Sequence, residues 1–284
     1  MSKFAMNNDD LLRRCIIKRL YFGTMIVFDL DDTLYKEADY VKSGIAAVCR
    51  ALDDRGVLSF SEAKAIIDNA GSTAQGFDLI VDAAHCKFGD NTLDIRQILD
   101  MYRTHIPDIS LDESTLEVLK RLRDSGEPVG LITDGRSIGQ QAKIKALGLE
   151  EFFAPEDILI SEETGFDKHC PQPFRRMMEQ HPQEHRFVYV GDNPRKDFIW
   201  PNQLGWITIM LRDVDGRNIH KQVVPGVTDS GDLQIVCENG DSHDPQTVCE
   251  NGDSLESGKK YAAQLAITSL AQLLEMLHNE YYVK

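Results

Sequence analysis

The stretch MIVFDLDDTLY, residues 25–35, ends an apolar run with several polar side chains. In an extended segment, side chains two positions apart share a face, so Asp29 and Asp31 are expected to point into one space while Asp32 points elsewhere. Two carboxylates without an adjacent cation repel each other, and a hard divalent cation relieves that repulsion. The stretch therefore predicts a metal site. Mg²⁺ is favoured, because it is held by a few oxygens and leaves positions for water and a phosphate.

A second acidic pair occurs in VGDNPRKD, residues 190–197. Asp192 follows another apolar run, and Asp197 comes after a turn that Gly191 and Pro194 favour. Together with the first cluster, this pair is expected to complete an acidic cup for one metal ion. The two basic residues of the turn, at 195 and 196, are interpreted as surface charges.

An anionic substrate attracted by such a metal also needs partners of its own. Thr133 offers a hydroxyl at the end of a strand-like run, and Gly135 allows backbone amides to approach an oxyanion. Lys168 is the leading candidate for a positive charge on phosphate. These groups predict phosphoryl transfer to a carboxylate, in which one Asp attacks phosphorus, the metal neutralises charge and a second Asp transfers protons.

Alternating strand and helix patterns would position these residues. Apolar runs predict strands, and periodic segments between them predict helices. This alternation predicts an α/β fold with a doubly wound parallel sheet, in which ligands bind beyond the carboxyl ends of the strands. The expected strands are 25–30, 129–135, 157–161, 186–193 and 206–211, and the expected helices are 111–126, 138–149 and 173–181.

The segment 37–110 contains no comparable strand pattern and is expected to be a small inserted helical cap domain. Its segments 40–56, 59–71 and 91–105 have helical periodicity. Such an insert would cover the polar strand ends and contact the leaving group. The candidates for that contact are Tyr35, Tyr40, Gln75, Phe77 and His85.

The two ends of the chain lie outside this pattern. Residues 1–24 are interpreted as a short basic amphipathic helix or tail, or as an upstream extension if Met25 is the natural start. QIVCENGDSHDP at 234–245 recurs as QTVCENGDSLES at 246–257, which is interpreted as a duplicated polar surface loop. A final amphipathic helix is expected over 266–282.

Composition narrows the class of function. The formal charge of −15 over 284 residues argues against nucleic-acid binding, because such a surface repels phosphate backbones. No apolar run approaches the roughly 18 residues of a membrane-spanning helix. The six cysteines form no CxxC pair, which favours reduced thiols and a cytoplasmic protein. The expected partner is a small soluble phosphate ester, and the sequence sets no oligomeric state.

The series DLDDT, LITDG, a downstream Lys and GDNPRKD resembles the haloacid dehalogenase superfamily, specifically its phosphatases with a helical cap inserted after the first motif. The resemblance covers residues 25 to about 215 and implies a core formed by 25–36 and 111–284. The second Asp of the first motif argues against carbon–halogen cleavage. The family commonly has Pro directly after the motif Lys, whereas His169 stands there in this chain.

That resemblance also implies residue roles. Asp29 would be the nucleophile that forms an aspartyl-phosphate, and Asp31 the general acid and base. Magnesium would be held by Asp29, the backbone carbonyl of Asp31 and Asp192, with Asp197 supporting the group. The transferred phosphoryl group would be bound by Thr133, Asp134 and Lys168.

Two alternatives remain beside a magnesium-dependent phosphatase. One is a phosphomutase of the same superfamily, and the other is a non-catalytic module that binds phosphate or a partner. The substrates left open are sugar phosphates, nucleoside monophosphates, flavin mononucleotide and phosphoglycolate.

Overall fold

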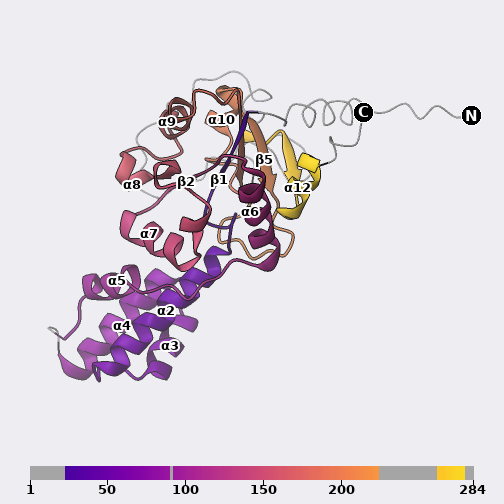
Figure 1. The fold of residues 1–284 in the computed structure, drawn as a ribbon. Helices are drawn as coiled ribbons and strands as arrows, with labels where there is room; N and C mark the ends of the chain where they lie inside the picture. Colours follow the sequence, from indigo (N-terminus) through magenta and orange to yellow (C-terminus); the bar gives the residue numbers. More distant parts are fainter. Residues whose placement is uncertain (1–22, 90–91, 224–260, 279–284) are drawn as a thin grey trace, which may run out of the picture. The chain divides into compact units, whose positions relative to one another are not determined.

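The computed structural model describes residues 23–89, 92–223 and 261–278 (Figure 1). The expected leader up to residue 22, the duplicated loop and the end of the final helix lie outside these ranges. The chain divides into two compact units. The first is drawn from Met1–Tyr35, Asp112–Asp134 and Phe152–Lys284, and the second from Lys36–Leu111 and Gly135–Glu151.

The first unit contains a parallel sheet of six strands in the order β3-β2-β1-β4-β5-β6. The predicted doubly wound α/β fold is therefore confirmed. Successive strands run outward from β1 in one direction and from β4 in the other, so the strand order reverses between these two neighbours. Ligands of such folds bind at the carboxyl ends of the strands at this reversal. The strands are β1 Thr24–Phe28, β2 Val129–Thr133, β3 Ile158–Ile160, β4 Arg186–Gly191, β5 Ile207–Leu211 and β6 Leu265–Ile267.

Alternating side chains anchor β1 on both faces of the sheet. Met25 and Val27 share one face and pack in an apolar cluster with Phe174 and Met177 of α9. Phe28 points to the other face, where its ring meets the Phe153 ring edge-on. Helices α6 and α12, which contact each other, also belong to this unit (Figure 1). Its helices are α6 Glu113–Ser125, α8 Ser161–Thr164, α9 Gln172–Gln180, α10 Ile199–Gln203 and α12 Ala271–His278, with a 3-10 turn at Pro155–Asp157.

The predicted final helix begins too early. Leu265–Ile267 forms strand β6, paired in parallel with β5, and α12 starts only at Ala271. Leu265 and Ile267 are buried on either side of an exposed Ala266, which is the alternation of a strand. Three residues are too few for periodicity to separate this pattern from the start of an apolar helix.

The second unit is helical, with α2 Glu37–Asp54, α3 Phe60–Asp68, α4 Thr73–Phe88 and α5 Ile95–Arg103 from the insert. Capping boxes at Ser59 and Asp94 start α3 and α5. Helix α7, Ser137–Ala146, and the 3-10 turn Leu149–Glu151 fall in this unit, whereas the sequence predicts them as part of the core. Helix α4 fills the part of the insert for which the sequence predicts no helix.

Four of the five leaving-group candidates already have partners within the helical unit. Tyr40 is buried and packs edge-on against Tyr102. Phe77 is buried in its apolar core and packs edge-on against Tyr102. A ring nitrogen of His85 lies 2.7 Å from the carbonyl oxygen of Leu93. Gln75 accepts a hydrogen bond from a backbone N–H in the preceding turn. These contacts are structural, so they give Phe77, Gln75 and His85 a role in the unit's own packing.

Two findings concern membrane-spanning helices and cysteines. Within the described ranges, no helix is long and apolar enough to cross a membrane. The described cysteines Cys49, Cys86 and Cys170 are free thiols.

Candidate active site

Three buried carboxylates meet where β1 and β4 end. Asp29 directly follows the β1 segment, Asp192 follows β4, and Asp197 lies in the next turn. One carboxylate oxygen from each lies within 4.8 Å of the others, and all three side chains are buried. The backbone N–H of Asp29 donates to the carbonyl of Val190 at 2.9 Å. Pairing of β1 with β4 therefore places the first and last acidic motifs side by side, at the reversal in strand order.

A tight turn brings Asp197 back to the end of β4. The backbone N–H of Asn193 donates to Asp197 Oδ2 at 2.8 Å, and the N–H of Asp197 returns to the Asn193 carbonyl at 2.9 Å. A Cβ on Gly191 would lie only 2.6 Å from Asp197 Oδ2. Glycine is needed at 191 because the carboxylate occupies the space of a side chain there.

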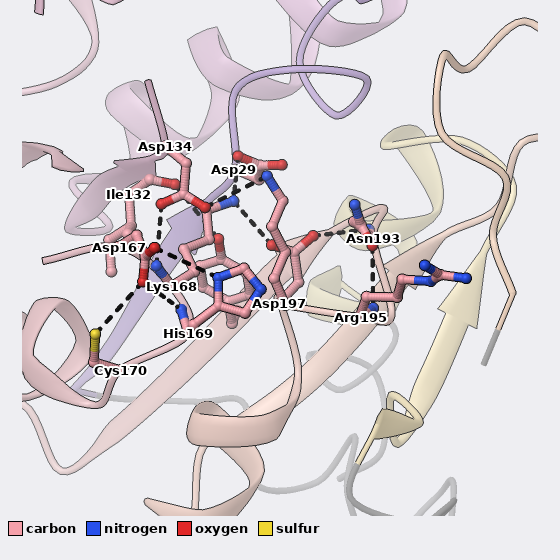
Figure 2. Close-up of polar contacts among 12 residues, drawn as sticks. Asp29, Ile132, Asp134, Asp167, Lys168, His169, Cys170, Asn193, Arg195 and Asp197 are labelled. Carbon is pink, nitrogen blue, oxygen red and sulfur yellow. Dashed lines mark hydrogen bonds and ion pairs between the residues drawn. The ribbon is translucent and has the colours of Figure 1, made fainter. Parts of the chain in front are cut away.

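Lys168 supplies a buried positive charge between two of these carboxylates. Its Nζ lies 2.5 Å from Asp29 Oδ1 and 2.8 Å from Asp197 Oδ1, and the side chain is 0% exposed (Figure 2). Its backbone N–H donates to Asp134 Oδ1 at 3.1 Å. Burial lowers the pKa of Lys168, but the carboxylates of Asp197 and Asp29 raise it well above its ordinary value. The ammonium is therefore charged.

The cluster still holds more negative charge than its lysines offset. Burial raises the pKa of Asp29 from 3.8 to about 7, with a further rise from Asp197, while Lys168 opposes the shift. Burial and the neighbouring carboxylates of Asp197 and Asp29 raise the pKa of Asp192 to about 8. Raised values of this kind mean that the ionised forms lack compensation.

A divalent cation fits this donor set. Hard cations take carboxylate oxygens, and Asp29 and Asp192 offer them on adjacent strand ends. Both oxygens of Asp197 already accept hydrogen bonds, from Lys168 and from Asn193, which suits a supporting role. Among the described residues, the carboxylates placed to share an ion are those of Asp29, Asp192 and Asp197. The Asp31 carboxylate does not belong to this group, so its predicted contribution is the backbone carbonyl.

The other two carboxylates of the first motif, those of Asp31 and Asp32, have different partners. The Tyr35 hydroxyl donates to Asp31 Oδ1 at 2.6 Å, and Asp31 remains partly exposed. Asp32 is buried, has φ of 56°, and accepts a hydrogen bond from the backbone N–H of Ile219. Asp31 is therefore oriented near solvent, as a proton-transfer group requires, and Asp32 is directed to a different segment.

The predicted phosphate-binding residues lie around Lys168. Thr133 is buried at the end of β2, next to Asp134. The Asp134 carboxylate receives the Lys168 N–H on one oxygen, and its other oxygen lies 3.4 Å from Lys196 Nζ. The Asp134 carboxylate therefore contacts the backbone of Lys168 and the ammonium of Lys196.

Two groups near the site differ from the sequence analysis: the interpretation of Lys196 as a surface charge is wrong, and Asn218 was not assigned. Arg195 is exposed, but the Lys196 side chain is only 25% exposed and pairs with Asp134. Burial and Lys168 lower the pKa of Lys196, but Asp29, Asp197 and Asp134 raise it more, so it is a second cation at the site. The amide of Asn218 donates to Asp192 Oδ2 at 2.8 Å. Its distance along the chain from every motif leaves no sequence signal for this contact.

Comparisons with known proteins agree with this geometry. The family model of the haloacid dehalogenase-like hydrolases matches residues 24–199. A glyceraldehyde 3-phosphate phosphatase of Methanocaldococcus jannaschii is 31% identical over 193 residues, covering 66% of this chain and 83% of that protein. A ribulose-1,5-bisphosphate 5-phosphatase of Halopiger xanaduensis is 26% identical over 204 residues, covering 66% and 84%. The solved 2-haloacid dehalogenase of Pseudomonas syringae has a TM-score of 0.51 at 18% identity, covering 91% of this chain and 99% of its own, which is a likeness of fold.

Proposed function

This chain is a phosphatase of the haloacid dehalogenase-like hydrolase family, and we propose that it hydrolyses a small phosphorylated sugar in a magnesium-dependent reaction. The reaction passes through an aspartyl-phosphate on Asp29. The supporting observation is the buried group of Asp29, Asp192 and Asp197 with the Lys168 ammonium inserted beside the nucleophile. Such a group attracts a divalent cation and, through it, a phosphate.

In the first step, a carboxylate oxygen of Asp29 attacks phosphorus and the bond from phosphorus to the ester oxygen breaks. Asp31 gives its proton to the departing oxygen, so the leaving group departs as a neutral alcohol. The Tyr35 hydroxyl, at 2.6 Å from Asp31 Oδ1, orients this acid. Magnesium held by Asp29, Asp192 and the Asp31 carbonyl would supply positive charge against the phosphoryl oxygens.

In the second step, water attacks phosphorus and the bond to the Asp29 oxygen breaks. Asp31, now ionised, takes a proton from the attacking water, so inorganic phosphate leaves and both carboxyl groups return to their starting states. Lys168 remains beside Asp29 throughout. Its buried ammonium stabilises Asp29 as a leaving carboxylate. Thr133, Lys196 and the backbone at Asp134 are proposed to contact the transferred phosphoryl group.

The names of the relatives support the proposed substrate class. The relatives at 31% and 26% identity are named for glyceraldehyde 3-phosphate and ribulose 1,5-bisphosphate, both small phosphorylated sugars. An acid at Asp31 assists departure of any alkoxide, which is a poor leaving group that needs a proton, so it supports ester hydrolysis. Departure of a halide needs none, so the likeness in fold to a dehalogenase does not extend to its reaction.

Phosphate release from a panel of phosphorylated sugars, nucleotides and phosphoglycolate, with magnesium or with a chelator, tests the proposal. We expect turnover that needs magnesium, is highest on small sugar phosphates and is abolished in Asp29→Asn. Asp124→Asn is the control, because this carboxylate is exposed and, within the part of the chain that the structure describes, pairs with its neighbour Arg123 alone. Turnover that survives Asp29→Asn would exclude the nucleophile assignment, and turnover that survives chelation would exclude the metal requirement.

A further inference from the structure

The loop that follows β5, residues 212–222 and here called the β5 loop, is closed by its own hydrogen bonds. Asp213 accepts the backbone N–H of Arg217 at 3.1 Å and that of Asn218 at 2.9 Å. The backbone N–H of Asp213 donates to Gln222 Oε1 at 2.9 Å. These bonds fix the middle of the loop relative to both of its ends.

The β5 loop holds Asp192 at two atoms. Asn218 Nδ2 donates to Asp192 Oδ2 at 2.8 Å, and Gln222 Nε2 donates to the Asp192 carbonyl at 2.9 Å. The same Gln222 nitrogen lies 2.7 Å from the carbonyl of Leu211 at the end of β5. The rotamer of Asp192 and its backbone are therefore both tied to this loop.

The loop is also tied to the first motif through Asp32. The backbone N–H of Ile219 donates to Asp32 Oδ2 at 2.9 Å. Asp32 is the one described non-glycine residue with a positive φ, 56°, a conformation that costs a residue with a side chain roughly 1 kcal/mol or more. A glycine would adopt this backbone without that cost. Unlike glycine, Asp32 has a carboxylate that accepts a hydrogen bond from the β5 loop.

We propose that the β5 loop positions Asp192 for metal binding, with Asn218 as the positioning residue and Asp32 as the anchor of the loop. This inference rests on the proposed magnesium site. A neutral amide suits the task, because it orients one carboxylate oxygen and leaves the negative charge for the metal ion. A lysine or arginine at 218 would orient Asp192 but would compete with the cation for its charge.

Calorimetric titration of the full-length protein with magnesium alone, without substrate, tests the inference. Asn218→Leu removes the donor at similar size, and loss of such a partner of a metal ligand typically weakens metal binding about 10-fold or more. Arg217→Gln is the control, since its side chain is exposed in the same loop and contacts neither Asp192 nor Asp32 in any hydrogen bond or ion pair of the described residues. We expect magnesium binding by Arg217→Gln to match the wild type.

The anchor is tested by two substitutions at Asp32 that both tolerate its backbone and both remove its charge. Asp32→Asn keeps an oxygen that accepts the Ile219 N–H, whereas Asp32→Gly removes the acceptor. We expect magnesium binding to be weakened about as much by Asp32→Gly as by Asn218→Leu, and less by Asp32→Asn. Relative to the wild type, the double variant Asp32→Gly/Asn218→Leu should lose magnesium affinity by a factor smaller than the product of the factors lost by the two single variants. Hydrogen exchange of the peptide spanning 213–223 should accelerate in Asp32→Gly and not in Asp32→Asn.

The outcomes separate the loop from the metal site. If the wild type binds no magnesium, the proposed function and the loop's role both fail. If the wild type binds magnesium and Asn218→Leu binds it equally well, the positioning role is wrong and the phosphatase proposal stands. Equal hydrogen exchange in Asp32→Gly and Asp32→Asn would remove Asp32 as the anchor.

Discussion

Replacing Lys168 with methionine removes the buried ammonium and keeps the length of the side chain. In the wild type, its Nζ lies 2.5 Å from Asp29 Oδ1 and 2.8 Å from Asp197 Oδ1, and all three side chains are buried. Lys168→Met leaves two buried carboxylates facing each other without their cation. Removing one partner of a buried ion pair typically costs about 3–5 kcal/mol of unfolding free energy, and we expect a loss of that size at pH 8 without metal.

The loss of unfolding free energy in Lys168→Met should be smaller at acidic pH, because a protonated carboxyl is neutral and has no charge for the ammonium to compensate. The pKa of Asp29 rises from an ordinary value of 3.8 to about 7 in the folded protein, and Lys168 is a group that holds this pKa down. Without Lys168, the folded pKa of Asp29 rises further, so above about pH 7 the variant holds a proton that the wild type releases, and its stability falls below that of the wild type. Holding this proton costs at most about 1.4 kcal/mol per pH unit, and the wild type bears the same cost up to about pH 7, so Asp29 protonation adds at most about 1.4 kcal/mol to the loss at pH 8 and nothing at pH 5.5. The rest of the loss expected at pH 8 comes from the buried contacts of Lys168 with Asp29 and Asp197.

Urea unfolding at pH 8 and pH 5.5, in the presence of a chelator, measures this difference. Lys196→Met is the matched control, because its side chain is 25% exposed and its carboxylate partner lies at 3.4 Å, so about 1 kcal/mol or less is expected at either pH. Added magnesium should recover part of the loss in Lys168→Met at pH 8, since a cation can replace some of the missing charge. A loss below about 1 kcal/mol at pH 8, or an equal loss at both pH values, would refute the argument that Lys168 compensates these carboxylates.

Two further predictions concern the metal ligands and the turn after β4. Because burial raises the pKa of Asp29 to about 7 and that of Asp192 to about 8 without metal, magnesium must displace their protons, so its affinity should rise between pH 6 and pH 9 and level off above about pH 9. Calorimetry across that range checks this, and an affinity independent of pH would contradict it. Gly191→Ala places a Cβ 2.6 Å from Asp197 Oδ2, so we expect a loss of about 1–3 kcal/mol in stability together with a lower kcat. Urea unfolding and steady-state kinetics measure both, and wild-type values in both would mean that the turn adjusts at little cost.

The sheet and the acidic cluster were predictable because their signals are local. Each core strand is a short apolar run, and the residues that could do chemistry come directly after it, as with Asp29 after β1 and Asp192 after β4. The carboxyl ends of parallel strands lie at one edge of the sheet. The motifs that follow these strands can therefore be predicted to lie together without knowing the structure of the residues between them. Asp29, Asp192, Asp197 and Lys168 do lie together, while their individual roles remain predictions.

The rest depends on contacts that no local pattern contains. Strand β6 is three residues long, and its identity comes from pairing with β5 rather than from its own sequence. The alternation of a strand predicts that Asp32 points away from Asp29 and Asp31. It does not predict the partner of Asp32, the backbone N–H of Ile219, which is 187 residues away in the chain. Asn218 is 26 residues from Asp192 and lies in a loop with no motif. Lysine is usually exposed, so the residue type of Lys196 indicates a surface position. In the structure it follows the tight turn that begins at Asn193 and pairs with Asp134.

The pKa of Asp29 links the proposed metal ion to the proposed nucleophile. A carboxyl group with a pKa of about 7 is only partly ionised near neutrality, and its protonated form cannot attack phosphorus. The Lys168 ammonium, although in contact with Asp29, does not overcome the burial of Asp29 and its repulsion by Asp197. Positive charge beyond that of Lys168 and Lys196 is therefore needed for Asp29 to be fully ionised near neutral pH. In the proposed reaction, burial of this carboxylate would make its ionisation depend on the same cation that binds the substrate, and the free protein holds this proposed nucleophile partly protonated.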